Sequence, residues 1–230
     1  MSNIVITGAN RGIGLELARH YAAKGHRVYA CCRDAGKATD LDDLAKTQDV
    51  HLLEVAVGED DSVAALAEQL SGVTVDILIN NAGTGGPPRE EQSALVMDFE
   101  GWADTMNINT FAPVRVMQAL LPNLRAAESA KVVNITSQMG ALSLDMTVAY
   151  AYCSSKAALN KFMRMAAIEL AKEDILVCLI HPGWVKTDMG GQAATLTAVE
   201  SAQGIIQTVD KLEAANTGSF WNWNGTTHDW

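Results

Sequence analysis

Short, continuous apolar runs alternate in this chain with longer segments of helical periodicity, and this alternation limits the possible folds most. The runs cover residues 4–6, 28–32, 51–55, 76–79, 131–135 and 175–180. Most lack the polar alternation of a half-exposed strand, so they suit strands buried on both faces of a parallel sheet. The segments between them predict helices near 12–24, 40–46, 61–70, 100–127, 152–173 and 197–213.

Strand–helix alternation of this kind implies right-handed βαβ units. The 230 residues fall within the range of one α/β domain, and no repeat, low-complexity tract or linker divides them. We therefore predict a single α/β domain over residues 1–230. Its core would be a doubly wound parallel sheet of about seven strands flanked by helices.

Composition excludes several function classes. A net charge of −10 argues against a nucleic-acid partner, because phosphate binding needs a basic face. No apolar stretch approaches a membrane span and no leader-like segment opens the chain, so we expect a cytoplasmic protein with no membrane partner. The histidines and cysteines show no ligand spacing, so no metal site is predicted. The chain has no GxSxG motif, so a serine hydrolase is not indicated.

A glycine-rich turn, TGANRGIG at residues 7–14, joins the first strand to the first helix. Gly8 permits a tight exit from the strand, Gly12 lets the backbone approach a pyrophosphate, and Gly14 allows the helix to pack closely on the sheet. The free N–H groups of the helix N-terminus then face the anion. The turn predicts a nucleotide-binding domain of the Rossmann type.

Two arginines bear on which nucleotide binds. Arg33 follows the second strand, where an arginine favours a 2′-phosphate, and Arg11 lies in the glycine turn on the same side. Two guanidinium groups can fork onto one phosphate. We therefore favour NADP(H) over NAD(H). In the alternative interpretation both arginines are solvated surface residues, and Asp34 caps a helix.

A tyrosine and a lysine lie four residues apart where the helix near 152–173 is expected to open. Tyr152 and Lys156 therefore project from one helix face. A nearby ammonium group stabilises a phenolate and lowers the pKa of the tyrosine towards neutrality, where it can exchange protons. Tyr150 has Ser154 at the equivalent spacing instead. A Tyr–Lys pair alone is more often an exposed surface pair, so its context decides.

Five motifs occur in the order found in the short-chain dehydrogenase/reductase family, which the chain resembles over essentially its whole length. They are the glycine turn, NNAG at 80–83, Ser137 after a buried strand, Tyr152 with Lys156, and HPGWVKTDMGG at 181–191. The last block, with GSF at 218–220, Gly225 and Trp230, looks most like the C-factor/Sniffer-like branch.

The resemblance implies a catalytic role for four residues. Tyr152 resembles the general acid/base, and Lys156 resembles the residue that lowers its pKa and contacts the nicotinamide ribose. Ser137 resembles the hydroxyl that holds the substrate oxygen. Asn109 resembles the residue that supports a water-linked proton relay to Lys156. Asn107 is a second asparagine in the same stretch, but the family's pattern counted back from residues 118–122 selects Asn109.

The resemblance also implies a set of cofactor contacts, in which Asn81 braces the sheet and Thr187 meets the carboxamide. The predicted set is Gly8, Asn10, Arg11, Gly12, Ile13, Gly14, Arg33, Asn81, Ala82, Gly83, Tyr152, Lys156, Pro182, Gly183, Val185 and Thr187. One position departs from the family pattern. Ala56 stands where an aspartate usually holds the adenine amino group, which puts that contact in doubt.

The expected reaction is hydride transfer between the nicotinamide and a carbonyl or alcohol. Ligands of such sheets bind at the carboxyl ends of the strands, so residues 84–96, 138–149 and 184–196 should surround the substrate. These segments contribute Met139, Leu142, Leu144, Met146, Trp184 and Met189. They suggest an apolar aldehyde, ketone or quinone. Alternatively, several of these side chains pack the loops.

The sequence leaves assembly and a second function open. By resemblance, the helices near 100–127 and 152–173 would build a homodimer or homotetramer. Trp221, Trp223 and Trp230 suit either a subunit interface or packing on their own domain. Resemblance to C-factor supports an alternative to a carbonyl reductase: an NAD(P)-binding signalling or regulatory protein.

Overall fold

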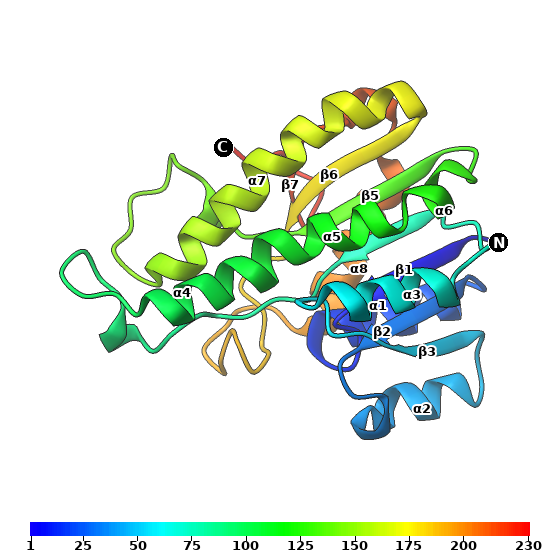
Figure 1. Cartoon of the computed structure of the whole chain (residues 1–230), viewed down its shortest axis with the longest axis horizontal. Helices are drawn as coiled ribbons and strands as arrows, with labels where there is room; N and C mark the ends of the chain where they lie inside the picture. The colour runs from blue at the N-terminus through cyan, green and yellow to red at the C-terminus, as the bar shows by residue number, and fades with distance from the viewer.

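Seven parallel strands form one sheet in the computed structural model, which describes residues 1–230 (Figure 1). They are β1 (Asn3–Thr7), β2 (Arg27–Cys32), β3 (Val50–Glu54), β4 (Ile77–Asn80), β5 (Ala130–Ile135), β6 (Ile175–His181) and β7 (Phe220–Asn222). Each of the six apolar runs overlaps one of the first six strands. The predicted parallel α/β fold is confirmed, and the short β7 is the strand whose place the apolar runs did not indicate.

Eight α-helices flank the sheet. They are α1 (Gly12–Ala23), α2 (Thr39–Ala45), α3 (Asp60–Gln69), α4 (Phe99–Met106), α5 (Ala112–Ala119), α6 (Leu121–Arg125), α7 (Tyr150–Leu170) and α8 (Ala198–Lys211). In Figure 1, α3, α5 and α7 cover the near face of the sheet, whereas α1 and α8 lie behind it. None of the helices is both long and apolar enough to span a bilayer.

The prediction of one helix over 100–127 is wrong, because two prolines interrupt that segment. Pro113 has no N–H for the carbonyl of Asn109, four residues back, and its ring crowds that carbonyl. The turn before it widens into a π-helix over Asn107–Phe111. Pro122 lies in the first turn of α6, after α5 has ended at Ala119. Such π turns are rare and frequently mark functional sites.

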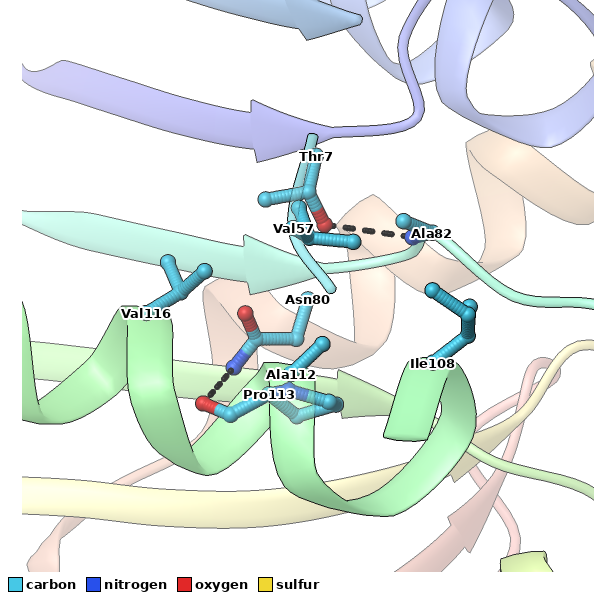
Figure 2. A pocket seen from close by; sticks show the side chains of 8 residues that line it. All are labelled: Thr7, Val57, Asn80, Ala82, Ile108, Ala112, Pro113 and Val116. Carbon is cyan, nitrogen blue, oxygen red and sulfur yellow. Dashed lines mark hydrogen bonds between the residues drawn. The ribbon is translucent and has the colours of Figure 1, made fainter. Parts of the chain in front are cut away.

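The strand order places a crevice between β1 and β4. The order is β3-β2-β1-β4-β5-β6-β7, so the chain winds outward in opposite directions on either side of this pair. Thr7, the last residue of β1, bridges the two strands, because its Oγ1 accepts hydrogen bonds from the main-chain N–H groups of Asn81 (3.0 Å) and Ala82 (3.1 Å). Figure 2 shows the bond from Ala82. Ligands of open α/β sheets bind at such a reversal.

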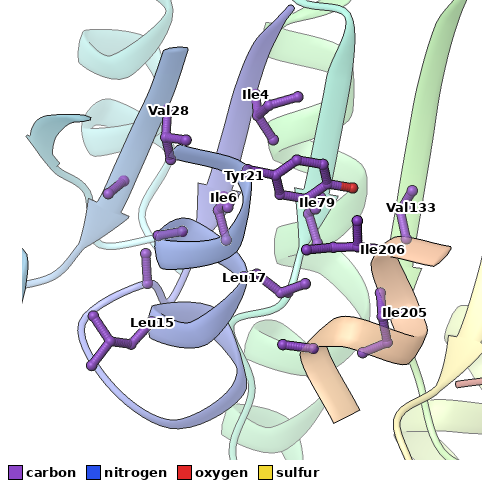
Figure 3. Packing of buried hydrophobic residues seen from close by; sticks show 14 of the residues in the cluster. Ile4, Ile6, Leu15, Leu17, Tyr21, Val28, Ile79, Val133, Ile205 and Ile206 are labelled. Atoms are coloured by element: carbon purple, nitrogen blue, oxygen red, sulfur yellow. The ribbon is translucent and has the colours of Figure 1, made fainter. Parts of the chain in front are cut away.

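Each face of the sheet buries its own apolar core. Ile4 and Ile6 of β1 pack with residues of α1 and α8, including Tyr21 and Ile205 (Figure 3). Val5 lies between them in sequence and packs on the opposite face, with α3, α5 and α7. Both faces are therefore covered, which explains why the strands read as continuous apolar runs. The two cores fix the loops at the carboxyl ends of the strands.

Candidate active site

The glycine turn forms a cradle that side chains would fill. Gly8 (φ +66°) and Gly12 (φ +55°) adopt the left-handed conformation that favours glycine. A Cβ on Gly8 would lie 2.9 Å from Cα of Ala82, and one on Gly14 would lie 2.2 Å from the carbonyl oxygen of Gly8. Arg11, the N-cap of α1, makes no side-chain hydrogen bond to the first turn. The main-chain N–H groups in the first turn of α1 are therefore free to bind an anion, and the cradle fits a pyrophosphate.

Asn81 holds this cradle against β4. Its Nδ2 donates to the main-chain oxygens of Thr7 and Gly8, each at 3.0 Å. Ala82 and Gly83 follow at the same edge, while Asn10 is exposed and Ile13 is half-buried in the turn opposite. The bracing expected of Asn81 therefore has a direct geometric basis.

The two arginines differ in their partners. Arg33 directly follows β2, is exposed and makes no ion pair. Arg11 instead pairs with Asp188, with 2.5 Å between Nη1 and Oδ2. Asp34 makes no side-chain capping bond and pairs with Lys37 at 2.6 Å. Arg33 is thus the arginine without an acidic partner at this corner of the crevice.

The segment after β6 crosses the glycine turn. Pro182 is held by its carbonyl, which accepts from Ser201 Oγ at 2.7 Å, and Val185 is buried. A Cβ on Gly12 would lie 3.1 Å from Thr187 Cγ2, so Thr187 lies over the turn. Gly183 adopts φ +84° where the chain turns from β6 towards the crevice. Of the predicted residues of this segment, Thr187 is the one that the structure places against the cradle.

Ser137, Tyr152 and Lys156 meet at the carboxyl end of β5. Ser137 is the second residue after β5, and Tyr152 is the third residue of α7 rather than its first. The Ser137 side chain lies close enough to the Tyr152 hydroxyl to lower its pKa. Lys156 is buried, its Nζ lies 5.8 Å from the centre of the Tyr152 ring, and it donates to the carbonyl of Ile135 at 2.9 Å.

Burial controls both titrating groups of this trio. It raises the pKa of Tyr152, and the nearby Ser137 side chain opposes that rise. It lowers the pKa of Lys156 to about 8. Burial therefore outweighs, in this structure, the lowering of the Tyr152 pKa that Lys156 is expected to cause. The physical reason is that an apolar environment disfavours phenolate and ammonium alike. Near neutral pH the phenol keeps its proton, and Lys156 stays mostly charged.

Of the two asparagines, Asn109 is the one beside α7. It is fully buried in the π-helix, and its Nδ2 donates to Ser155 Oγ at 3.0 Å and to the carbonyl of Thr84 at 2.8 Å. Its Oδ1 accepts from the N–H of Thr84 at 2.8 Å. Asn107 instead donates to the carbonyl of Gly58 at 3.1 Å. Asn109 therefore joins α7 to the loop after β4.

Ala56 presents no polar side chain to the crevice. It lies two residues beyond β3, and its N–H donates to Ser62 Oγ at 2.8 Å. The departure from the family pattern therefore stands, and nothing at Ala56 replaces the missing carboxylate.

Three loops project beyond the carboxyl ends of β4, β5 and β6, at the left of Figure 1. Their large apolar side chains are mostly exposed rather than packed within the loops: Leu142, Leu144, Met146, Trp184 and Met189. Met139 is half-buried. A Cβ on Gly85 would lie 3.9 Å from Met189 Cγ, so the first and third loops approach each other.

The tryptophans and cysteines considered in the sequence lie outside the candidate site or pack within the domain. Trp221 and Trp223 pack against one core and Trp230 against the other, so all three pack on their own domain. Cys31, Cys32 and Cys178 are buried thiols, as expected of small apolar residues, and Cys153 is half-buried. No cluster of His, Cys, Asp or Glu has metal-binding geometry.

Sequence patterns missed two side chains near the site, Asp188 and Gln92. Asp188 meets Arg11 across 177 residues, and Gln92 accepts from the N–H of Ala151 across 59 residues. Neither belongs to a motif with a local signature. Asp188 stood within a recognised block, but only the fold reveals its partner.

A doubly wound sheet with a pyrophosphate cradle at its reversal defines a class, the Rossmann-type nucleotide-binding proteins. Comparison with known proteins narrows it. A family model described as short chain dehydrogenase matches residues 2–198. C-signal of Myxococcus xanthus is 41% identical over 168 residues, which cover 72% of this chain and 99% of that protein.

Solved structures agree over the full length. The NADPH-bound carbonyl reductase from chicken fatty liver is 33% identical with a TM-score of 0.92, covering 100% of this chain and 99% of that one. The carbonyl reductase Sniffer of D. melanogaster is 32% identical with a TM-score of 0.92 and complete coverage of both chains. The chain belongs to the short-chain dehydrogenase/reductase family, in its C-factor/Sniffer-like branch, and is an NAD(P)-dependent oxidoreductase.

Proposed function

We propose that this enzyme reduces an apolar aldehyde, ketone or quinone with NADPH, and that Tyr152 is its catalytic acid. The observation that carries the proposal is the meeting of Tyr152, Ser137 and buried Lys156 beside the glycine cradle. Exposed apolar side chains on the surrounding loops support an apolar substrate. The carbonyl reductases among its relatives support the same reaction class.

The residues divide the reaction between them. A bound nicotinamide supplies the hydride that adds to the carbonyl carbon. Ser137 and Tyr152 donate hydrogen bonds to the substrate oxygen, where negative charge develops. Tyr152 then transfers its phenolic proton to that oxygen, and the product is an alcohol. The Lys156 ammonium stabilises the phenolate that remains, and Asn109 holds the loop beside it.

The cofactor would lie along the carboxyl edge of β1, β2 and β4. The N–H groups at the start of α1 would hold its pyrophosphate, and Arg33 would meet a 2′-phosphate. The remaining contacts proposed are those of the predicted set, with Arg11 available only when its pair with Asp188 opens. The NADPH bound to the chicken carbonyl reductase supports NADP(H) as the cofactor.

Calorimetric titration with NADPH and NADH tests the cofactor assignment. We expect tighter binding of NADPH, and a loss of that preference in Arg33→Asp, because the substitution sets a carboxylate against the 2′-phosphate. One charged hydrogen bond is worth about 1.5–3 kcal/mol, so NADPH affinity should fall at least tenfold. Unchanged NADPH affinity would exclude Arg33 from the site, and binding of neither nucleotide would remove the proposed function.

C-signal, at 41% identity, keeps a second candidate function in view: an NAD(P)-binding signalling or regulatory protein. The two candidates separate in Tyr152→Phe, which should lose reductase activity while keeping cofactor binding. A biological effect that survives in this variant would favour the signalling function. Loss of the effect together with turnover would favour the reductase.

A further inference from the structure

The helix that carries Tyr152 begins without a cap of its own. Its N-cap, Ala149, adopts φ +50° and ψ +51°, and its side chain has no acceptor to offer the first turn. Ala149 is one of two non-glycine residues with positive φ, a conformation in which the alanine Cβ crowds its own backbone. Uncapped helix ends leave N–H groups unpaired and fray readily. Something outside α7 must therefore hold this turn in place.

Gln92, from the loop between β4 and α4, supplies the missing acceptor. Its Oε1 accepts the N–H of Ala151 at 2.9 Å, and both residues are buried. Its Nε2 donates to the carbonyl of Pro87 at 2.5 Å. Both ends of the amide are thus engaged, one on α7 and one on its own loop.

The loop around Gln92 is itself ordered by main-chain bonds. Gln92 pairs with Met97 in an antiparallel bridge, and the N–H of Ser93 donates to the carbonyl of Val96 at 2.7 Å. The N–H of Asp98 donates to the carbonyl of Glu91 at 2.9 Å. This small hairpin fixes the amide of Gln92 relative to the start of α4.

Further along α7, other contacts hold the helix in place. Trp102 Nε1 donates to Ser154 Oγ at 2.8 Å, and Lys156 is tied to β5 through the carbonyl of Ile135. Loosening the first turn would therefore move Tyr152 while Lys156 stayed in place. Ala151, which Gln92 holds, is the residue directly before Tyr152.

We infer that Gln92 is a positioning residue that sets the Tyr152 hydroxyl against Ser137 and Lys156. It does so through the main chain of α7 and touches neither the cofactor cradle nor the reacting oxygen. This inference rests on the proposed function, because it assigns Gln92 to the placement of the catalytic acid.

The test compares Gln92→Met, which keeps the length and loses both hydrogen bonds, with Gln92→Glu, which keeps the acceptor for Ala151 and can donate to Pro87 only while its carboxyl group is protonated. NADPH consumption is followed with benzaldehyde, cyclohexanone and 1,4-naphthoquinone. Gln92→Met should lower kcat at least tenfold and leave the KM for NADPH within about twofold, since sub-ångström misplacement penalises chemistry rather than binding. Gln92→Glu should recover most of the kcat at pH 6, relative to wild type at the same pH, and lose it as the pH rises, because the ionised carboxylate would face the carbonyl of Pro87. Gln207→Met, the same change on the exposed face of α8, is the matched control.

If Gln92→Met does not fold, Gln92→Asn replaces it, because its shorter side chain cannot reach Ala151. Wild-type kcat in the variant that lacks the bond would overturn the positioning role alone. So would equal losses in Gln92→Met and Gln92→Glu at pH 6, which would show that the acceptor for Ala151 is not what matters. Absence of turnover in the wild-type enzyme with all three carbonyls would instead overturn the proposed function, and the positioning role with it.

Discussion

At the scale of single residues, the site depends on burying a charge where chemistry needs one. Lys156 is 4% exposed, and its Nζ has one hydrogen-bond acceptor, the carbonyl of Ile135. Burial lowers its pKa from 10.5 to about 8, which means that the folded state disfavours the ammonium. The residue is therefore expected to cost stability in return for holding a positive charge beside Tyr152.

Lys156→Met should stabilise the protein while removing activity. The pKa difference corresponds to about 3 kcal/mol at 1.36 kcal/mol per unit, which is an upper bound on the gain in unfolding free energy. The carbonyl of Ile135 would lose its partner in this variant, and that loss should reduce the gain to about 1 kcal/mol. Below pH 8 the lysine is charged in folded and unfolded chains alike, so the cost is complete. Between pH 8 and 10.5 the folded state binds fewer protons, and wild-type stability rises with pH.

Urea unfolding at pH 7 and pH 10 checks this prediction. The stability advantage of Lys156→Met should be largest at pH 7 and should shrink as the pH approaches 10. A variant that is less stable than wild type at pH 7 would contradict the account of burial given for Lys156.

At the scale of elements, α7 combines a strained start with a supported middle. Ala149 holds a left-handed conformation that costs an alanine about 1 kcal/mol, and glycine adopts it freely. Glycine is also a better N-cap than alanine. These gains exceed the added flexibility of the unfolded chain, so Ala149→Gly should stabilise the fold by about 0.5–1 kcal/mol. The melting temperature should rise by about 2 °C for a chain of this size.

Differential scanning calorimetry measures this shift. Asp174→Gly relieves a left-handed residue remote from the site, at φ +57°, and should give a similar rise. A lower melting temperature for Ala149→Gly alone would mean that the Ala149 methyl group contributes packing that outweighs its backbone strain.

The elements also show how far sequence patterns reach. The buried runs located six strands because strands covered on both faces carry no polar alternation. The position of β7 was not predicted, because this strand has three residues, of which Phe220 alone is buried. The break at Pro113 has a local cause and could have been predicted from the missing N–H. The contacts Arg11–Asp188 and Gln92–Ala151 could not, because they depend on how distant loops fold over the sheet.

At the scale of the whole molecule, the face formed by α5, α7 and the π-helix leaves large apolar side chains uncovered. They are Phe111, Phe162, Met165 and Ile168. Phe162, Met165 and Ile168 lie at helical spacing on α7, and Phe111 lines the same surface hollow as Phe162. Apolar patches of this kind usually mark interaction sites. Together with the family resemblance, they support a homo-oligomer built on this face.

Light scattering on the purified chain tests the assembly. We expect a particle of at least twice the 24.6 kDa chain, and a shift to the monomer in Ile168→Glu, because the substitution buries an unpaired charge in the interface. Val199→Glu, at another exposed apolar position on α8, should leave the mass unchanged. A monomeric wild type at micromolar concentration would contradict this assignment.

The most direct test of the central claim is NADPH consumption by Tyr152→Phe, measured beside Tyr150→Phe with the best carbonyl substrate of the wild type. Tyr150 lies on the same helix turn without a lysine four residues on, so the two variants lose the same atom in different surroundings. We expect Tyr152→Phe to lose between a hundredfold and about ten-thousandfold in kcat with NADPH binding intact, and Tyr150→Phe to stay near wild type. Turnover that survives in Tyr152→Phe would contradict the account.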